Sequence, residues 1–230
     1  VDVDAICDSK GNFVIGGLME HIEPAGIHSG DSACCLPSIS LGNESLSIIR
    51  KWANELALRL KVNGLINLQF AVQRDDRGQE KVFIIEANPR ASRTVPFVSK
   101  ATGFALARIA TSVMAGRTIK ESGLSKEPNP PLQTIKEAVL PFRRFPGSDS
   151  VLGPEMRSTG EVMGSAESFG MAYAKSELAA GEALPTSGIV FLSTHDRDKV
   201  SLIPIAKNLK KLGFGLIATN GTAETLIKAG

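Results

Sequence analysis

The sequence is poor in cysteine, and this shortage excludes two kinds of protein. Its 230 residues include three cysteines, Cys7, Cys34 and Cys35. An odd number with no CxxC spacing predicts neither a disulfide framework nor a zinc site. We interpret the three as buried apolar residues of a reduced compartment. A redox-sensitive Cys34 is the alternative.

The sequence also lacks an excess of one charge and a long apolar run. It has 26 basic and 24 acidic residues spread along the chain, which predicts no nucleic-acid or membrane binding. No apolar run approaches the roughly 20 residues that span a bilayer. The opening VDVDAICDSK is unlike a signal peptide and is typical of the middle of a strand. We therefore expect a piece of a longer protein, cut at both ends.

Alternating strand and helix patterns predict an α/β fold in three regions. Strands and helices alternate in the first region, proline-punctuated connections with one helix near 165–181 fill the second, and a strand–helix–strand pattern forms the third. The expected regions are 1–116, 117–186 and 187–230. The first should contain a strand at 12–23, a Gly/Ser-rich loop at 26–38, a helix at 44–60, strands at 64–72 and 81–87, and a helix at 98–116 closed by Gly116.

The strands 64–72 and 81–87 should form a hairpin with polar and apolar faces. RDDRG between them favours a turn in which Gly78 has a positive φ. A turn centred on Arg77 and Gly78 places Gln69 opposite Glu86 and Asn67 opposite Asn88. The other face would carry Ile66, Leu68, Phe70, Val72, Phe83, Ile85 and Ala87. A bulge at the turn could shift this register.

Two interpretations of the polar face remain open on spacing alone. One carboxylate with amide oxygens is a ligand set suited to Mg²⁺ and nucleotide phosphates. In the stretch IIEANPRASRT, Arg90 and Arg93 would then face a transferring phosphoryl group. The alternative is a solvated sheet face with ordinary salt bridges. The loop EHIEPAGIHSGDSA is equally ambiguous, because it is either a phosphate-binding loop or a surface turn.

Longer motifs resolve this ambiguity by resemblance to one family. VDVDAICD, EHIEPAGIHSGDSACCLP, GLINLQFAV, IIEANPRASRTVPFVSKATG, KEAVLPFRRFPG and LGPEMRSTGEVMG resemble the large subunit of carbamoyl-phosphate synthetase. More narrowly, the chain is similar to its second ATP-grasp half, an α+β lobe with an antiparallel sheet, which forms carbamoyl phosphate. The start of a methylglyoxal-synthase-like, Rossmann-type parallel α/β regulatory domain follows. The resemblance covers essentially the whole chain.

The resemblance implies an ATP site made by the hairpin and the loop. A pair of divalent metals, Mg²⁺ or Mn²⁺, would be bound by Gln69, Glu86 and Asn88. Arg90 and Arg93 would hold carbamate and the phosphoryl group. The residues that match nucleotide contacts are His21, Gly26, Ile27, His28, Ser29, Gln69 and Glu86.

Regulatory residues are implied in the same way. Glu23, Asp31 and Glu137 match the region of the ornithine activator and a monovalent cation such as K⁺, where uncompensated acidic side chains would suit an ammonium group.

Near the end of the chain, Lys199, Thr219 and Thr222 match residues that bind the phosphate of UMP or IMP. In ATNGTAE, hydroxyls and a glycine lie where a strand meets a helix N-terminus, which suits phosphate binding. Simple N-capping by the two threonines is the alternative. Asn220 replaces a histidine common in bacterial relatives, which leaves the effector open.

The implied parent is a glutamine-hydrolysing, ATP-dependent C–N ligase that serves pyrimidine and arginine biosynthesis. It would phosphorylate carbamate without a protein nucleophile, by positioning and electrostatics. Its partner would be a small glutamine amidotransferase subunit, in a homo-oligomer of heterodimers. It would work in the cytoplasm or, alternatively, the plastid stroma. Lysine and arginine contacts from the other ATP-grasp lobe are expected upstream of Val1, so the chain alone should be inactive.

Two alternatives belong to other classes. The chain could come from another ATP-grasp ligase, such as a biotin carboxylase or a phosphoribosylamine-type ligase, although those lack a regulatory module after GPEMRSTGEVMG. It could also be a non-catalytic nucleotide-sensing module. A pure sensor would have no reason to keep the phosphoryl-transfer groups.

Overall fold

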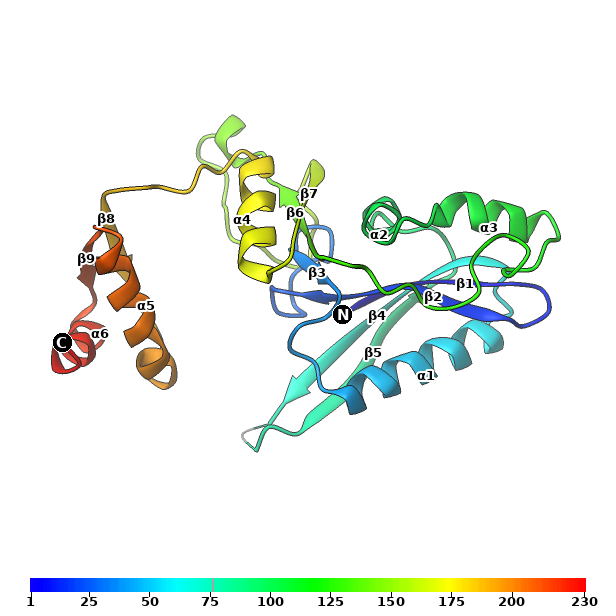
Figure 1. Ribbon diagram of the computed structural model, residues 1–230, viewed down its shortest axis with the longest axis horizontal. Coiled ribbons are helices and arrows are strands. Elements are labelled where there is room, and N and C mark those ends of the chain that lie inside the picture. Colours follow the sequence, from blue (N-terminus) through cyan, green and yellow to red (C-terminus); the bar gives the residue numbers. More distant parts are fainter. Residues whose placement is uncertain (76) are drawn as a thin grey trace. The chain divides into compact units, whose positions relative to one another are not determined.

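The computed structural model describes residues 1–75 and 77–230, which form two compact units (Figure 1). Unit 1 is Val1–Glu182 and unit 2 is Ala183–Gly230. Among the described residues, no helix is long and apolar enough to cross a membrane.

Unit 1 is built, in its described residues, on a seven-stranded antiparallel sheet, the sheet type that the family resemblance implies for residues 1–116. Its spatial order is β5-β4-β1-β2-β3-β6-β7, and every neighbouring pair is antiparallel. The strands are β1 (Asp2–Cys7), β2 (Phe13–His21), β3 (Cys34–Leu36), β4 (Gly64–Arg74), β5 (Glu80–Asn88), β6 (Gln133–Val139) and β7 (Gly160–Ala166).

Helices cover both faces of this sheet, because the strands carry apolar side chains on both sides. Helix α1 (Asn43–Arg59) packs on one face, and α2 (Val95–Thr102) and α3 (Leu106–Met114) pack on the other (Figure 1). Strand β1 alternates between the two cores: Val3 and Ala5 lie in the α1 core, and Ile6 lies in the α2–α3 core. The residues of even number in β1 therefore share the α2–α3 face.

Further along, α4 (Phe169–Ala180) packs on β6 and β7, and a short 3₁₀ helix covers Phe142–Arg144. The approach of α4 to β7 is so close that a Cβ on Gly164 would overlap the Ala172 carbonyl oxygen and the Ser176 nitrogen. The region predicted as proline-punctuated connections thus supplies two strands of the main sheet.

Two predicted elements are wrong in detail. The expected loop 26–38 contains strand β3, which is too short to show a period of two. The expected helix 98–116 is two helices, since Gly103 has a φ of +79° and ends α2 in the left-handed conformation. Gly116, with a φ of +101°, directly follows Ala115, the C-cap residue of α3.

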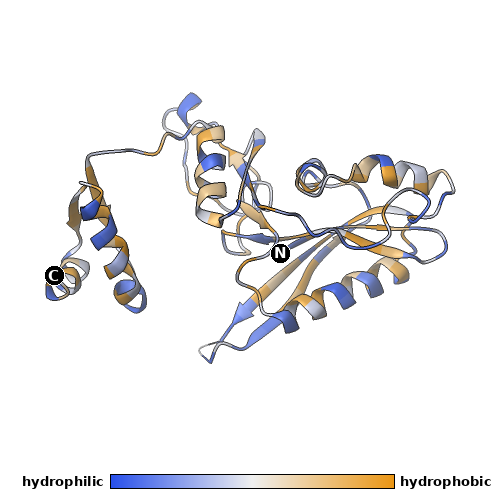
Figure 2. Cartoon of the chain, in the orientation of Figure 1, coloured by the Kyte–Doolittle hydropathy of each residue, from blue (hydrophilic) through white to orange (hydrophobic). Residues whose placement is uncertain are grey.

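The predicted hairpin register is confirmed where the polar residues lie. Gln69 pairs with Glu86, and Asn67 pairs with Asn88. The strand ends next to the connecting turn are hydrophilic (Figure 2).

Immediately beyond this stretch, a bulge in the strands, rather than at the turn, shifts the register by one residue. Phe70 consequently pairs with Ile84. Phe83 and Ile85, predicted on the apolar face, are 47% and 52% exposed, and Val82 packs against the α1 core instead. The extra residue is in β5, so the β5 side chains between it and the turn change face, whereas those of β4 keep the predicted one.

Unit 2 has the parallel α/β pattern that the sequence predicts. Strands β8 (Ile189–Leu192) and β9 (Gly215–Ala218) are parallel neighbours. Between them lie a 3₁₀ helix (Asp196–Asp198) and helix α5 (Lys199–Lys211), and α6 (Asn220–Lys228) follows β9. Leu192, Leu202 and Ala206 form the small core.

Candidate functional site

A polar cavity of about 110 Å³ lies in unit 1, on the α2–α3 side of the sheet. Residues from β1, β4, β5 and β7, the loop 28–30 and the loop 90–94 line it. They are Asp2, His28, Ser29, Gly30, Asn67, Gln69, Glu86, Asn88, Arg90, Ser92, Arg93, Thr94 and Glu161. The polar face of the hairpin and the Gly/Ser-rich loop, which are far apart in the sequence, therefore line the same cavity.

Two rows of polar side chains cross β1, β4 and β5 at this cavity. Each row takes one residue from each strand, and adjacent members are paired in the sheet. The rows are Asp2, Gln69 and Glu86, and Asp4, Asn67 and Asn88. The two aspartates are functional candidates that the sequence interpretation missed. Their signal was the alternation VDVD, which places both carboxylates on one face of a strand.

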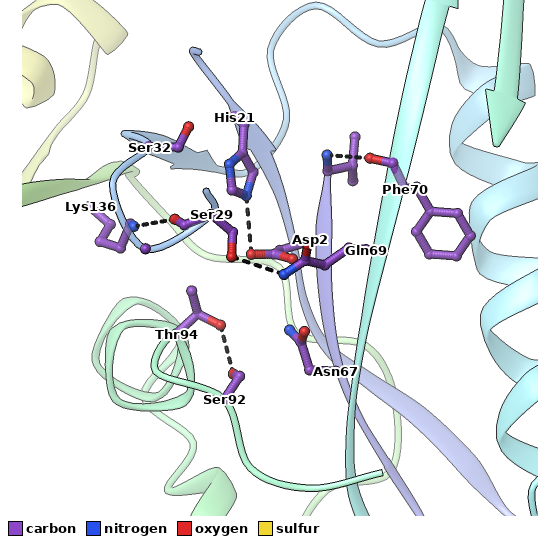
Figure 3. Close-up of polar contacts among 12 residues, drawn as sticks. Asp2, His21, Ser29, Ser32, Asn67, Gln69, Phe70, Ser92, Thr94 and Lys136 are labelled. Carbon is purple, nitrogen blue, oxygen red and sulfur yellow. Dashed lines mark hydrogen bonds and ion pairs between the residues drawn. The ribbon is translucent and has the colours of Figure 1, made fainter. Parts of the chain in front are cut away.

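The amide groups of the rows are oriented by protein hydrogen bonds. Gln69 Nε2 donates to Ser29 Oγ at 2.9 Å, and Asn88 Nδ2 donates to Glu86 Oε1 at 2.8 Å (Figure 3 shows the first). Because each NH₂ group already has a protein acceptor, the carbonyl oxygens remain for a ligand. Asp2 Oδ1 is buried and, among the described residues, has no hydrogen-bond partner.

These oxygens fit a divalent cation. Glu86 contributes a carboxylate, Gln69 and Asn88 contribute amide oxygens, and the unpartnered Asp2 oxygen adds negative charge at the floor. Mg²⁺ prefers a few protein oxygens together with phosphate and water. The residues present could therefore hold such an ion.

His21 lies beside this floor rather than in the lining. Its Nε2 is 3.1 Å from Asp2 Oδ2, and both side chains are largely buried (Figure 3). The contact fixes the imidazole against β1.

The arginines enter the cavity from the loop after β5. Arg93 Nε is 3.4 Å from Glu161 Oε1, and Arg93 Nη1 contacts the Met156 sulfur. Arg90 Nη1 donates to the Ala91 carbonyl at 3.0 Å. Two guanidinium groups next to oxygen ligands can hold an anion between them and a metal.

Backbone and side-chain hydrogen bonds hold the loop 28–30 in place. The His28 N–H donates to the Gly153 carbonyl at 2.8 Å, and Lys136 Nζ donates to the Ser29 carbonyl at 3.2 Å (Figure 3). A Cβ on Gly30 would lie 2.9 Å from Met156 Sδ and 3.2 Å from Arg93 Nη1, so a larger residue there would displace these cavity side chains.

Gly26 and Ile27 lie in the preceding turn and outside the cavity lining. A Cβ on Gly26 would meet nothing within 4 Å.

The expectation of uncompensated acidic side chains is wrong for Asp31. This residue is 1% exposed, and its carboxylate accepts from the backbone N–H groups of Arg157 and Ser158, each at 2.7 Å. Burial raises the pKa of Asp31, but hydrogen bonds from Ser158 and Arg157 outweigh burial and hold the pKa below its ordinary value. Asp31 therefore fastens the loop to the segment 151–158.

Glu137 differs, because its charge is poorly compensated. Burial, followed by the nearby Glu177 and Glu23 carboxylates, raises the pKa of Glu137 to about 7 despite a hydrogen bond from Ala138. Its Oε2 is buried with no hydrogen-bond partner among the described residues. Glu23 instead accepts from Ser32 Oγ and the Ala33 N–H, both at 2.7 Å.

In unit 2, the three residues matched to a phosphate site lie together. Lys199 Nζ pairs with Asp196 Oδ1 at 2.6 Å and lies next to Gly221, the second residue of α6. Thr219 Oγ1 donates to Thr222 Oγ1 at 3.2 Å and makes no capping bond to α6.

Solved structures define the class of fold. The biotin carboxylase domain of a single-chain bacterial carboxylase matches 60% of this chain and 31% of its own, with a TM-score of 0.50 and 20% identity. The biotin carboxylase domain of 2-oxoglutarate carboxylase from Hydrogenobacter thermophilus, solved with MgADP and bicarbonate, matches 72% of this chain and 41% of its own, with a TM-score of 0.52 and 15% identity. At these identities the likeness shows an ATP-grasp fold of the biotin carboxylase type, and no more.

The sequence comparisons identify the family. The model for the carbamoyl-phosphate synthase L chain, ATP binding domain, matches residues 1–122, so the chain belongs to this family. The carbamoyl phosphate synthase large chain of Nostoc sp. is 57% identical over 230 residues. The arginine-specific, chloroplastic large chain of Oryza sativa subsp. japonica is 55% identical over 226 residues. The chain spans about a fifth of these relatives, 21% and 19% of their lengths, and 100% and 98% of its own length is matched.

Proposed function

We propose that this chain forms part of an ATP-dependent ligase that phosphorylates carbamate to carbamoyl phosphate. One observation carries the proposal: a single cavity combines the oxygen set of Gln69, Glu86 and Asn88 with Arg90 and Arg93. Metal-bound ATP needs the first group, and a transferring phosphoryl group needs the second.

The residues would act through charge and position. Mg²⁺, when bound, would neutralise charge on the nucleotide phosphates. Glu86 would supply the ionic ligand, Gln69 and Asn88 the neutral ones, and Arg90 and Arg93 would hold the carbamate and stabilise the phosphoryl group. No nucleophilic side chain is needed, because the carbamate oxygen is itself the nucleophile.

The loop would contribute to nucleotide binding from the opposite wall. Gln69 donates a hydrogen bond to Ser29, so a ligand that binds either residue would also affect the orientation of the other. His28 lines the cavity, His21 would act from behind Asp2, and Gly26 and Ile27 would approach the nucleotide from the outer turn.

Regulation by ornithine and by UMP or IMP is part of the proposal. The poorly compensated Glu137 carboxylate, next to Glu23, suits an ammonium group or K⁺, whereas Asp31 would act by fixing the loop. The cluster of Lys199, Thr219 and Thr222 suits an effector phosphate.

The whole parent would draw ammonia from a small glutamine amidotransferase subunit, in a homo-oligomer of heterodimers, and would accept Mn²⁺ in place of Mg²⁺. It would work in the cytoplasm or the plastid stroma. The chloroplastic name of the rice relative supports the second location.

The alternatives are less well supported. Biotin carboxylase domains share the fold at 20% identity or less, whereas large chains of carbamoyl phosphate synthase reach 57%. A nucleotide-sensing module would not explain two arginines beside the ligand set. Activity and binding measurements can distinguish these alternatives from the proposed ligase.

The test compares Glu86→Gln with Glu55→Gln in the full-length parent. Glu55 is an exposed residue of α1, remote from the cavity lining, so it controls for the loss of one charge. We expect Glu86→Gln to abolish carbamoyl-phosphate synthesis and Glu55→Gln to leave it unchanged. Synthesis that survives Glu86→Gln would refute the site assignment.

Binding can be measured on the 230-residue chain. Calorimetric titration with MgADP, in wild type and in Glu86→Gln, should show metal-dependent binding that the variant loses. Titration with UMP and with IMP would test the effector assignment. Binding of nucleotide without any dependence on metal or Glu86 would favour the sensing module.

A further inference from the structure

The cavity rests on a buried carboxylate that none of the comparisons assigns a role. Asp4 is 1% exposed and accepts three side-chain hydrogen bonds. Asn67 Nδ2 and Ser92 Oγ donate to its Oδ1 at 2.9 and 2.7 Å, and Thr94 Oγ1 donates to its Oδ2 at 2.6 Å.

Two of these donors flank a cavity arginine. Ser92 and Thr94 are the neighbours of Arg93 in the chain, and their hydroxyl oxygens are 2.8 Å apart (Figure 3). Among the described residues, the side-chain hydrogen bonds from this pair to the sheet go to Asp4. The carboxylate therefore links the loop that carries Arg93 to strand β1.

The third donor connects the same carboxylate to the ligand rows. Asn67 is paired with Asp4 on one side and with Asn88 on the other. One buried group thus fixes both the loop above the cavity and the middle of the second row.

We propose that Asp4 is a positioning residue, whose carboxylate holds Ser92 and Thr94 so that Arg93 faces the row formed by Gln69 and Glu86. The inference deepens the proposed function and rests on it, because Arg93 would hold carbamate there. A carboxylate suits this task, since it offers acceptors to three donors at once and cannot itself donate when ionised. Asparagine of the same shape would present an NH₂ group to one of the hydroxyls.

The presence of a carboxylate at this position is not explained by packing. Burial is the main cause that raises the pKa of Asp4, to about 6, and the three hydrogen bonds only partly offset it. An apolar residue would avoid this cost but would leave the Asn67, Ser92 and Thr94 donors without their acceptor, which is itself destabilising for each buried group.

The test uses the full-length parent in the reverse direction, the formation of ATP from MgADP and carbamoyl phosphate. This reaction requires the proposed site without ammonia or glutamine. We expect Asp4→Asn to lower kcat/KM for carbamoyl phosphate at least tenfold and to leave KM for MgADP within about twofold, because Arg93 faces the carbamoyl phosphate (1.4 kcal/mol per tenfold change).

Two matched variants separate positioning from folding. Thr94→Val keeps the shape and loses the hydroxyl, so it should reproduce the defect, whereas Thr94→Ser keeps the hydroxyl and should restore most of the activity. In an Arg93→Ala background, Asp4→Asn should add little further loss, because both changes act on one group. Thermal unfolding of each variant reports folding independently, and if Asp4→Asn fails to fold, the Thr94 pair decides the question.

The possible results distinguish failure of the proposed function from failure of the positioning role of Asp4. A wild-type parent that forms no ATP from MgADP and carbamoyl phosphate would overturn the proposed function. An active wild type in which Arg93→Ala is damaging, but Thr94→Val and Asp4→Asn are not, would overturn the inference alone. Full additivity of Asp4→Asn and Arg93→Ala would do the same.

Discussion

Asparagine at position 4 should make unit 1 more stable relative to wild type as the pH rises. Folding raises the pKa of Asp4 from its ordinary 3.8 to about 6, with burial as the largest cause. Below 3.8 both the folded and the unfolded chain hold the proton, so the group contributes no penalty. Between 3.8 and about 6 the unfolded chain releases the proton first, and the folded state loses stability as the pH rises.

The magnitude follows from the shift. Each pKa unit is worth 1.36 kcal/mol, so the shift from 3.8 to about 6 corresponds to about 3 kcal/mol of lost stability above pH 6. Asparagine does not titrate. The difference in unfolding free energy between Asp4→Asn and wild type should therefore move by about 2 kcal/mol in favour of the variant between pH 4 and pH 8, because the unfolded chain has already lost part of the proton at pH 4.

The assay is urea unfolding followed by the fluorescence of Trp52, the single tryptophan of the chain. Trp52 packs against the α1 core, so it reports on unit 1 alone. Asp8→Asn is the control of opposite sign. Burial raises the pKa of Asp8, but hydrogen bonds from Asn12, Ile119 and Lys10 outweigh it and lower the pKa below 3.8.

That control should lose stability at neutral pH, and the loss should shrink as the pH falls through the lowered pKa. A stability difference between Asp4→Asn and wild type that is the same at every pH would refute the assigned titration of Asp4.

Three further predictions follow from close approaches in the structure. Gly30→Ala should weaken MgADP binding in calorimetry, because its Cβ presses on the surrounding cavity side chains. Gly170→Ala, in α4 and outside the cavity lining, should bind as wild type, and equal affinities of the two variants would contradict the geometry of the loop. Gly164→Ala should lower the unfolding free energy by about 1–3 kcal/mol or more, because its Cβ meets the backbone of α4. In the same urea experiment Gly170→Ala, with nothing within 4 Å, should be neutral or stabilise by up to about 1 kcal/mol, and a larger loss for Gly170→Ala than for Gly164→Ala would contradict the packing. Lys199→Ala should reduce UMP or IMP affinity at least tenfold, and unchanged affinity would remove Lys199 from the phosphate site.

Local patterns predicted the elements that have a clear period or a clear end signal. The helix α1 and the strands β4 and β5 repeat apolar residues over enough positions to be recognised. The pairing of Gln69 with Glu86 followed from the turn and from the need to keep polar and apolar faces apart. The oxygen ligands of the candidate site could therefore be placed together from the sequence.

The sequence alone was thus enough to predict the hairpin pairing that brings Gln69, Glu86 and Asn88 together, and the family to which the chain belongs. The packing of the whole sheet was needed to show that β1 lies beside β4, which brings Asp2 into the cavity lining and buries Asp4 against Asn67. The same packing binds Asp31 to residues more than a hundred positions away. The bulge that exposes Phe83 was equally hidden. Periodicity records which face a side chain occupies, but not which distant strand or backbone N–H will meet it, because those partners are fixed by packing of the whole sheet.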